Sequence, residues 1–587
     1  MRAGRMRPFL SIATRARRWL FGRDFSVWYD PRYRLPLPSL EPRTGFDARR
    51  ADFAAWFLVE SGAVPASRMR RPARISYEDL ARVHSPELLD SLDRAETLAR
   101  IYSVDSGGVQ PAEMLSSIRL ACGATLQAAR SCLQPRTRRV ARRELNLSGG
   151  FHHAGRARAG GFCAVNDIAV AIAALRHEGF TGRVAILDLD AHPPDGTAEC
   201  LRGDGDVWIG SISGSRWGPL PGVDETVLPE GTSDREYLDA LERLLARVPA
   251  ADLAFVVAGG DVLSGDALGK LGLTLRGARE RDLRVADAFF HVPSVWLAAG
   301  GYSANAWRAL AGTGLALAAR TRAEIPAGYD PLAERYSRIA ARLTPAELGP
   351  PADEDELMLA ELGQRPSRPL LLGYYSAEGL ELALSRYGLL AELRRLGYGR
   401  FRVAVSNEAV GDRAQLFGQD GSAHEHLLIE LVVEKREVAG EPLLYVHWLT
   451  LRHPLARFSE QRPALPDQEV PGLGLAREMG NLLARMAERL GLAGVAFRPA
   501  AFHTAYAGRG QLRFVNPERQ GLFEALVRDL AGMPLASATA AVASGQVMLD
   551  GAPYRWEPDE MVLWLRPRAE DSAAIAAARD AAHFTPR

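Results

Sequence analysis

Three apolar segments in the first half of the chain lead directly into polar or glycine-rich sequence. They are VAIL at 184–187, LAFVVA at 253–258 and VWLAA at 295–299, each short and free of proline, as expected of buried strands. Helical patterns separate them, at 234–248 and 275–290. This alternation predicts an α/β fold with a parallel sheet covered by helices on both faces, and such sheets bind ligands at the carboxyl ends of their strands.

The first of these strands continues into Asp188-Leu189-Asp190-Ala191-His192. Alternate side chains of an extended segment point the same way, so Asp188, Asp190 and His192 share a face. Two carboxylates and an imidazole suit a divalent cation, and three protein ligands leave a coordination position for water, as in catalytic zinc sites. If one carboxylate has another role, a ligand must come from elsewhere. The alternative is an ordinary strand end, where an Asp caps the next helix and the His is exposed.

Two adjacent histidines, His152 and His153, lie in a glycine-rich stretch upstream of this motif. Consecutive buried histidines are a rare solution for core packing. Either one is a candidate metal ligand or general acid–base, and each would need a carboxylate to fix its tautomer, for which Asp188 and Asp195 are the candidates. The polar residues expected at the rim formed by the three strand ends are Asp188, Asp190, His192, Asp261 and Tyr302.

Composition limits the class of protein but not its substrate. The 587 residues carry a net charge of +1, with 47% hydrophobic and 24% charged residues, which indicates a soluble globular protein and argues against a nucleic-acid binder. The four cysteines form no Cys-x-x-Cys pair, so we expect reduced thiols and a cytoplasmic location. The arginine-rich segment 1–23 is too interrupted for a signal peptide or a membrane span. It is either a solvated arm or a basic helix on anionic lipid.

The length predicts two or three domains. A stretch rich in proline, alanine and acidic residues marks a linker between them. The expected organisation is a basic arm at 1–23, an α/β domain at 24–342, the linker at 343–369, a mixed α/β domain at 370–570 and a tail at 571–587.

Five sequence blocks occur in an order that resembles the zinc-dependent histone deacetylase superfamily, whose fold is arginase-like. The resemblance covers residues 24–325, and it is closest to the class IV branch, to which FDARR at 46–50 is also similar. The blocks are GGFHHA (149–154), GGFCAVND (160–167), DLDAHPPDGT (188–197), AGGDVLSGDALGKLGLT (258–274) and AAGGYS (298–303).

The resemblance implies an amidohydrolase with one zinc ion per chain, held by Asp190, His192 and Asp261. It implies that Tyr302 donates a hydrogen bond to the developing oxyanion. Zinc polarises a carbonyl and acidifies water, and a phenol beside it stabilises a tetrahedral oxyanion, so these residue types suit the implied roles.

The histidine pair also acquires roles from the resemblance. His152 and His153 would flank the attacking water, with Asp188 and Asp195 as their carboxylate partners. Asp188 would also help to hold a structural potassium ion. The residues expected to form the substrate channel are Gly161, Phe162, Trp217 and Gly301.

Some positions depart from the family pattern. HPPD at 192–195 stands where many members have His-His-Gly-Asp, which stiffens the turn but keeps the ligand. The segment 211–223 lacks the usual His and paired aromatics, so Trp217 is expected to replace a wall aromatic, and a second monovalent site is in doubt. The two-manganese site of arginase needs carboxylates where this chain has Pro194 and Leu263, which favours one metal.

The last third of the chain has a different pattern, with a helix, antiparallel strands, a glycine-containing loop at 471–475 and a further helix. It is weakly reminiscent of Gcn5-related acyltransferases, although Glu469 stands where Arg or Gln is expected. Both a binding role and acyltransferase activity remain open. Scattered surface or core positions are expected for His424, His426, His447 and His503.

The expected function is zinc-dependent removal of an acetyl or longer acyl group from lysine of a protein or peptide. An acetylpolyamine or other small acylated amine is the alternative substrate, and the basic early residues Arg32, Arg34 and Arg43 disfavour a polycation. A non-catalytic scaffold and a bifunctional deacylase–acyltransferase are also compatible with the sequence.

Overall fold

The computed structural model describes residues 22–37, 40, 44–134, 141–349, 368–459, 463–466 and 468–587. The chain divides into two units, residues 1–331 and 332–587. Most of the expected basic arm and the central part of the expected linker lie outside the described residues. Among the helices that are described, none is both long and apolar enough to cross a membrane.

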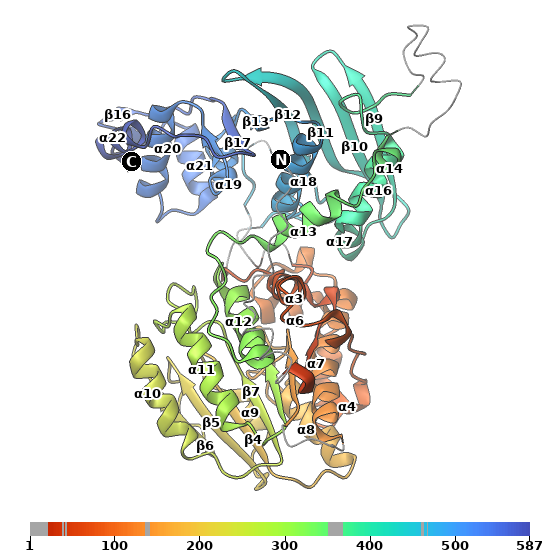
Figure 1. The fold of residues 1–587 in the computed structure, drawn as a ribbon, viewed down its shortest axis with the longest axis vertical. Coiled ribbons are helices and arrows are strands. Elements are labelled where there is room, and N and C mark those ends of the chain that lie inside the picture. Colours follow the sequence, from red (N-terminus) through yellow and green to blue (C-terminus); the bar gives the residue numbers. More distant parts are fainter. Residues whose placement is uncertain are drawn as a thin grey trace. The chain divides into compact units, whose positions relative to one another are not determined.

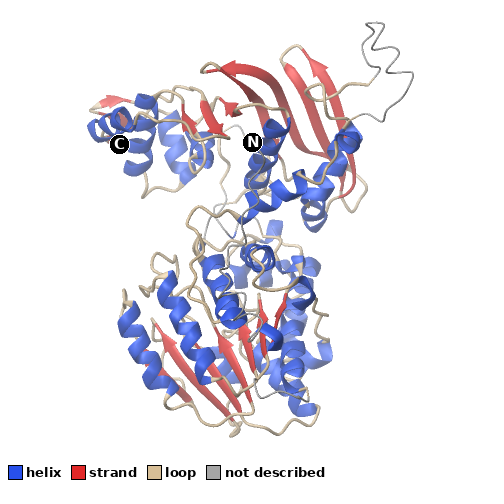
Figure 2. Cartoon of the chain, viewed as in Figure 1, coloured by secondary structure: helices blue, strands red, loops and turns tan. Residues whose placement is uncertain are grey.

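A parallel sheet of eight strands forms the centre of the first unit, in the order β2-β1-β3-β8-β7-β4-β5-β6 (Figures 1 and 2). Every strand pairing in it is parallel, which confirms the predicted fold class. The three predicted strands appear as β4, β7 and β8, with every residue buried. The strands are β1 (Phe25–Trp28), β2 (Met69–Arg70), β3 (Arg143–Asn146), β4 (Val184–Asp188), β5 (Val207–Ser213), β6 (Val223–Val227), β7 (Leu253–Val257) and β8 (Ser294–Leu297).

Helices cover both faces of this sheet, as Figure 1 shows, with α7 and α8 on one side and α10, α11 and α12 on the other. Proline sets two boundaries: α5 begins at Pro86 behind the N-cap Ser85, and α7 begins at Pro111. The helices are α3 (Arg50–Glu60), α4 (Tyr77–Ala81), α5 (Pro86–Ser91), α6 (Ala95–Tyr102), α7 (Pro111–Leu133), α8 (Asp167–His177), α9 (Asp195–Cys200), α10 (Asp234–Leu245), α11 (Leu275–Ala288) and α12 (Ala306–Ala319).

The second unit is built on a mixed sheet in the order β14-β17-β13-β12-β11-β10-β9. Only β12 and β13 are parallel neighbours in it, and β10 was not expected from the sequence. Its strands are β9 (Gly399–Glu408), β10 (Gly411–Gln419), β11 (Glu425–Val438), β12 (Glu441–Leu451), β13 (Gly494–Phe497), β14 (Arg513–Phe514) and β17 (Met561–Trp564). Its helices are α13 (Pro331–Ala340), α14 (Pro345–Leu348), α16 (Ala377–Tyr387), α17 (Leu389–Arg395), α18 (Ala476–Arg489), α19 (Phe502–Gly508), α20 (Pro517–Asp529), α21 (Leu535–Ala543) and α22 (Ser572–Ala581).

The segment expected to be a tail, 571–587, is folded into this unit. Helix α22 packs against α20, where Gly521 leaves room for its backbone, because a Cβ there would lie 2.4 Å from the Ile575 oxygen. Strand β18 (Phe584–Pro586) pairs with β15 (Val547–Leu549), which also pairs with β16 (Ala552–Pro553). The predicted tail is therefore a helix and a strand of the second unit, and the small alanine side chains of α22 permit this close helix packing.

The boundary between the units also differs from the expected one at 342. Tyr336 of α13 is buried, and its ring centroid lies 4.6 Å from that of Tyr387 on α16, so α13 is part of the second unit.

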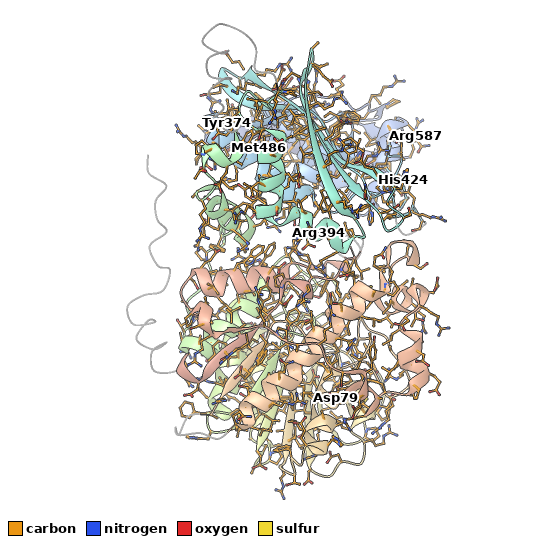
Figure 3. All side chains as sticks on the ribbon, turned by 90° about the vertical axis from the view of Figure 1, so that its right-hand side faces the viewer. Asp79, Tyr374, Arg394, His424, Met486 and Arg587 are labelled. Atoms are coloured by element: carbon orange, nitrogen blue, oxygen red, sulfur yellow. The ribbon has the colours of Figure 1, made fainter. Side chains whose placement is uncertain are left out.

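Figure 3 labels Met486 on α18 and His424 in the turn before β11. His424 is exposed, and His426 pairs with Asp420 at 2.8 Å.

Candidate active site

The three proposed metal ligands meet where β4 and β7 end. These strands are direct neighbours, so Asp190 and His192, which follow β4, lie beside Asp261, which follows β7. The Nδ1 atom of His192 lies 3.2 Å from Oδ1 of Asp190 and 3.1 Å from Oδ2 of Asp261. One ligand atom from each residue fits within a group less than 4.8 Å across.

The charges of this group fit a divalent cation. Asp190 and Asp261 are both buried. Burial, and then the neighbouring Asp190 charge, raise the pKa of Asp261 to about 7. Burial disfavours a charged His192, but its hydrogen bonds to the two carboxylates outweigh this effect and raise its pKa to about 11. A bound dication would replace that proton, and two carboxylate oxygens with one imidazole nitrogen suit zinc.

Each histidine of the adjacent pair is bonded to its own carboxylate. Nδ1 of His152 lies 2.9 Å from Oδ2 of Asp188, and Nδ1 of His153 lies 2.7 Å from Oδ1 of Asp195. The two ring centroids are 4.0 Å apart. Gly161, at φ 55°, permits this arrangement, because a Cβ there would lie 2.5 Å from Cδ2 of His153. In both rings Nε2 is the nitrogen that remains for chemistry.

The two imidazoles differ in basicity. Burial disfavours a charged His152, but the charges of Asp188 and Asp190 outweigh it and raise the pKa of His152 to about 9. For His153, burial and then the charge of His152 dominate and lower its pKa to about 4. A charged and a neutral imidazole side by side can give and take a proton in one reaction.

Tyr302 lines the same cavity as the proposed ligands Asp190 and His192. Its backbone N–H donates to Oδ2 of Asp266 at 2.6 Å, and its ring packs against Phe46 and Phe162, with centroids 6.0 and 5.5 Å away. Burial, and then the charges of Asp190 and Asp261, hold the pKa of Tyr302 well above its usual value. The hydroxyl therefore stays protonated and can donate a hydrogen bond.

Arg50 supports the turn that carries Tyr302. Its guanidinium donates to the backbone oxygens of Ala299 and Gly301, and it stacks on Phe46. Ala299 has a positive φ of 48°. In the sequence Arg50 and Asp266 stand out only as parts of the blocks FDARR and AGGDVLSGDALGKLGLT, and neither was predicted as a site residue.

A cavity connects these groups, and it includes most of the predicted site residues. Two predicted channel residues lie outside its lining: Gly301 accepts the bond from Arg50, and Trp217 stacks on His153 with centroids 4.7 Å apart. Trp217 lies in the segment between β5 and β6 and is 51% exposed. The predicted residues that line the cavity are His152, His153, Gly161, Phe162, Asp190, His192 and Tyr302.

Comparison with known proteins identifies the first unit. The model of the histone deacetylase domain matches residues 45–316. "Histone deacetylase 2" of Arabidopsis thaliana is 32% identical over 49% of this chain and 76% of its own, and an uncharacterised protein of Picosynechococcus is 30% identical over 48% and 93%. The solved HDA15 HD domain covers 52% of this chain and 90% of its own at 22% identity, with a TM-score of 0.41. The chain belongs to the histone deacetylase family.

Proposed function

We propose that the first unit is a zinc-dependent amidohydrolase that removes an acyl group from the side chain of an acylated lysine. The observation that carries the proposal is that two metal-ligand side chains, two carboxylate-bonded histidines and one tyrosine line a single cavity, with the third ligand, Asp261, grouped beside the first two. A scaffold protein has no structural need for this combination.

In this mechanism Asp190, His192 and Asp261 hold the ion. When bound, zinc supplies a Lewis acid that polarises the amide carbonyl and lowers the pKa of a water molecule. Tyr302 donates its hydroxyl proton in a hydrogen bond to the carbonyl oxygen as that oxygen gains negative charge. Phe162, between Tyr302 and Tyr102, provides an apolar wall for the acyl-lysine chain.

The histidines move the protons. Nε2 of the neutral His153 accepts a proton from water as the water oxygen bonds to the amide carbon. When the carbon–nitrogen bond breaks, an imidazolium of the pair returns a proton to the leaving nitrogen, so the products are a carboxylic acid and a free amine. Asp195 and Asp188 keep both Nδ1 atoms occupied, which fixes the tautomers.

Metal removal and replacement test this proposal. The purified protein should hydrolyse a fluorogenic acyl-lysine peptide, lose activity on chelation and recover it with one equivalent of Zn²⁺. Asp190→Ala should neither bind zinc nor turn over. Activity that survives both chelation and Asp190→Ala would refute the zinc mechanism, and a zinc-loaded wild type inactive on every acyl amine would favour the scaffold alternative.

The substrate proposed is an acyl-lysine peptide with acyl chains from acetyl to long. Apolar side chains also line the cavity, among them Leu35, Leu40 and Ile118, which suits an acyl chain longer than acetyl. The class IV resemblance points the same way. Comparing kcat/KM on acetyl-lysine, myristoyl-lysine and acetylspermidine tests it, and a preference for acetylspermidine would favour the polyamine alternative.

Leu35→Trp narrows that part of the cavity. If the acyl chain passes Leu35, this variant should lower kcat/KM on myristoyl-lysine about tenfold more than on acetyl-lysine, because excluding a methylene from a pocket costs about 1–3 kcal/mol. Equal losses of kcat/KM on both substrates would mean that the acyl chain does not pass Leu35.

A structural potassium ion beside Asp188 is also proposed. Ser211 lies next to Asp188 in the register of β4 and β5, and its buried hydroxyl has no hydrogen-bond partner among the described residues. Buried polar groups usually have a partner, so a cation bound there would satisfy this oxygen. Thermal unfolding in K⁺ against a tetramethylammonium salt should show a higher Tm in K⁺, and Ser211→Ala should reduce the difference.

For the second unit we propose a binding role. Strands β12 and β13 pair in parallel over the short stretches 444–446 and 495–497. The loop that contains Gly474, at φ 73°, leads into α18. This geometry is compatible with an acyl-donor site. Glu469, however, is bonded to Arg452. Calorimetry with acetyl-coenzyme A tests for the acyltransferase alternative.

A further inference from the structure

The two histidine–aspartate pairs hold their carboxylates in different ways. Asp188 is fully buried, and its second oxygen, Oδ1, accepts a hydrogen bond from the backbone N–H of Asp190 at 3.2 Å. Asp195, at the start of α9, is partly exposed, and its second oxygen accepts a bond from Nη2 of Arg158 at 2.7 Å. The second carboxylate oxygen is thus held by an arginine side chain in Asp195 and by a backbone N–H in Asp188.

The guanidinium of Arg158 is bonded to both halves of the His153–Asp195 pair. Besides Asp195, it contacts the backbone of the histidine itself, because Nη1 donates to the His153 oxygen at 3.2 Å. Its Nε donates to Oε2 of Glu199, one turn further along α9, at 2.9 Å. Guanidinium donors have fixed directions, so these three bonds together set the carboxylate relative to the backbone that carries the imidazole.

This contact acts on orientation more than on charge. The Arg158 side chain is 49% exposed, so water screens its charge. The terminal torsion of an aspartate is broad, and a carboxylate held at one oxygen alone would swing and carry the imidazole with it. Arg158 does not line the cavity that the described residues form, so its effect passes through Asp195.

We propose that Arg158 is a positioning residue that orients His153 for proton transfer by holding the second oxygen of Asp195. This inference rests on the proposed function of the same site. It assigns to an exposed loop arginine a role that neither its position in the sequence nor its exposure suggests.

Kinetics of matched variants test the role. Arg158→Ala should lower kcat about 10- to 100-fold, as is usual for partners that orient reacting side chains, with KM and zinc content unchanged. Arg158→Lys should recover part of kcat, because the lysine ammonium can still donate one hydrogen bond to Asp195. Arg156→Ala, a control from the same loop, should have the wild-type kcat. In an Asp195→Ala background, Arg158→Ala should have no further effect. Wild-type kcat in Arg158→Ala, a change in KM alone, or additive effects would overturn the proposal.

A measurement that does not depend on turnover separates this inference from the proposed function. In metal-free protein labelled with ¹⁵N-histidine, the Nδ1 proton shared by His153 and Asp195 should give a downfield NMR signal, identified by its loss in His153→Gln. Arg158→Ala should shift or broaden this signal, while Arg156→Ala should not. An unchanged signal would overturn the inference, whereas a shifted signal in a protein inactive on every acyl amine would refute the proposed function alone.

Discussion

The imidazole of His153 and the indole of Trp217 are stacked, with centroids 4.7 Å apart and planes at 21°. The same indole lies 5.8 Å from the His192 ring, so it borders a candidate acid–base and a candidate metal ligand at once. Trp217 belongs to a segment that departs from the family pattern, yet it supplies an aromatic surface beside the site.

Replacing this indole tests its part in binding. Trp217→Ala should raise KM for an acyl-lysine peptide about 3- to 10-fold, because an aromatic contact contributes about 0.5–1.5 kcal/mol beyond its buried area. Trp217→Phe should keep most of the affinity. Steady-state kinetics on both variants check this. An unchanged KM in the alanine variant would show that Trp217 does not contact the substrate.

Tyr302→Phe tests oxyanion stabilisation by removing only a hydroxyl. We expect kcat to fall by about 10²–10³, the usual effect of losing one oxyanion donor, while zinc content stays the same. Metal analysis and kinetics on one preparation provide the measurement. Turnover of Tyr302→Phe at the wild-type rate would mean that another group stabilises the oxyanion.

Zinc affinity should fall as the pH falls. In the metal-free site the pKa of His192 is about 11 and that of Asp261 about 7, so binding must displace protons from these ligands. Affinity should therefore decrease about tenfold per pH unit for each proton displaced. Competition with a chromophoric chelator at pH 8, 7 and 6 measures the slope, and a pH-independent affinity would contradict the proposed ligands.

The buried imidazole of His84 should make stability sensitive to mild acid. Burial lowers its pKa from 6.5 to about 4, and it is bonded to the Gly155 oxygen at 3.0 Å and to the Asn166 N–H at 2.9 Å. Between these values the unfolded chain binds a proton that the folded chain does not, so stability is lost as the pH falls below 6.5. The contribution of His84 to the loss between pH 7 and pH 5 should be about 2 kcal/mol.

Urea unfolding of the metal-free wild type and of His84→Gln, compared at pH 7 and pH 5, isolates this contribution. His84→Gln, which can replace both hydrogen bonds, should show a smaller loss between the same pH values. Equal losses in both proteins would mean that other groups cause the acid sensitivity.

Gly521 should be needed for the docking of α22. Gly521→Ala places a methyl 2.4 Å from the Ile575 oxygen, so the second unit should lose about 1–3 kcal/mol of stability, as for other overpacked positions. Gly480→Ala in α18 is the matched control, because no described atom outside the backbone of its own helix lies within 4 Å of its added carbon, and it should be neutral or stabilising. Thermal unfolding and protease resistance of the C-terminal region compare the two.

The sequence predicted those parts of the site that depend on regular geometry. Asp190, His192 and Asp261 directly follow buried strands, and parallel strands bring such residues to one edge. Arg158 was not predicted because its role arises from a loop folding back on α9, which leaves no periodic signal. The segment 571–587, predicted to be a tail, folds as α22 and β18, and its packing on α20 depends on a long-range contact at Gly521 that has no local sequence pattern.

Residues 192 and 261 lie 69 positions apart, although their side chains touch. During synthesis a chain that has emerged only as far as His192, just after β4, carries two of the three proposed ligands, too few for a closed site. Capture of the proposed ion would therefore follow the pairing of β7 with β4, and a bound ion would tie together two strands that enter the fold at different times. A metal bound at this proposed site would reinforce the long-range pairing of β4 with β7 and would not initiate it.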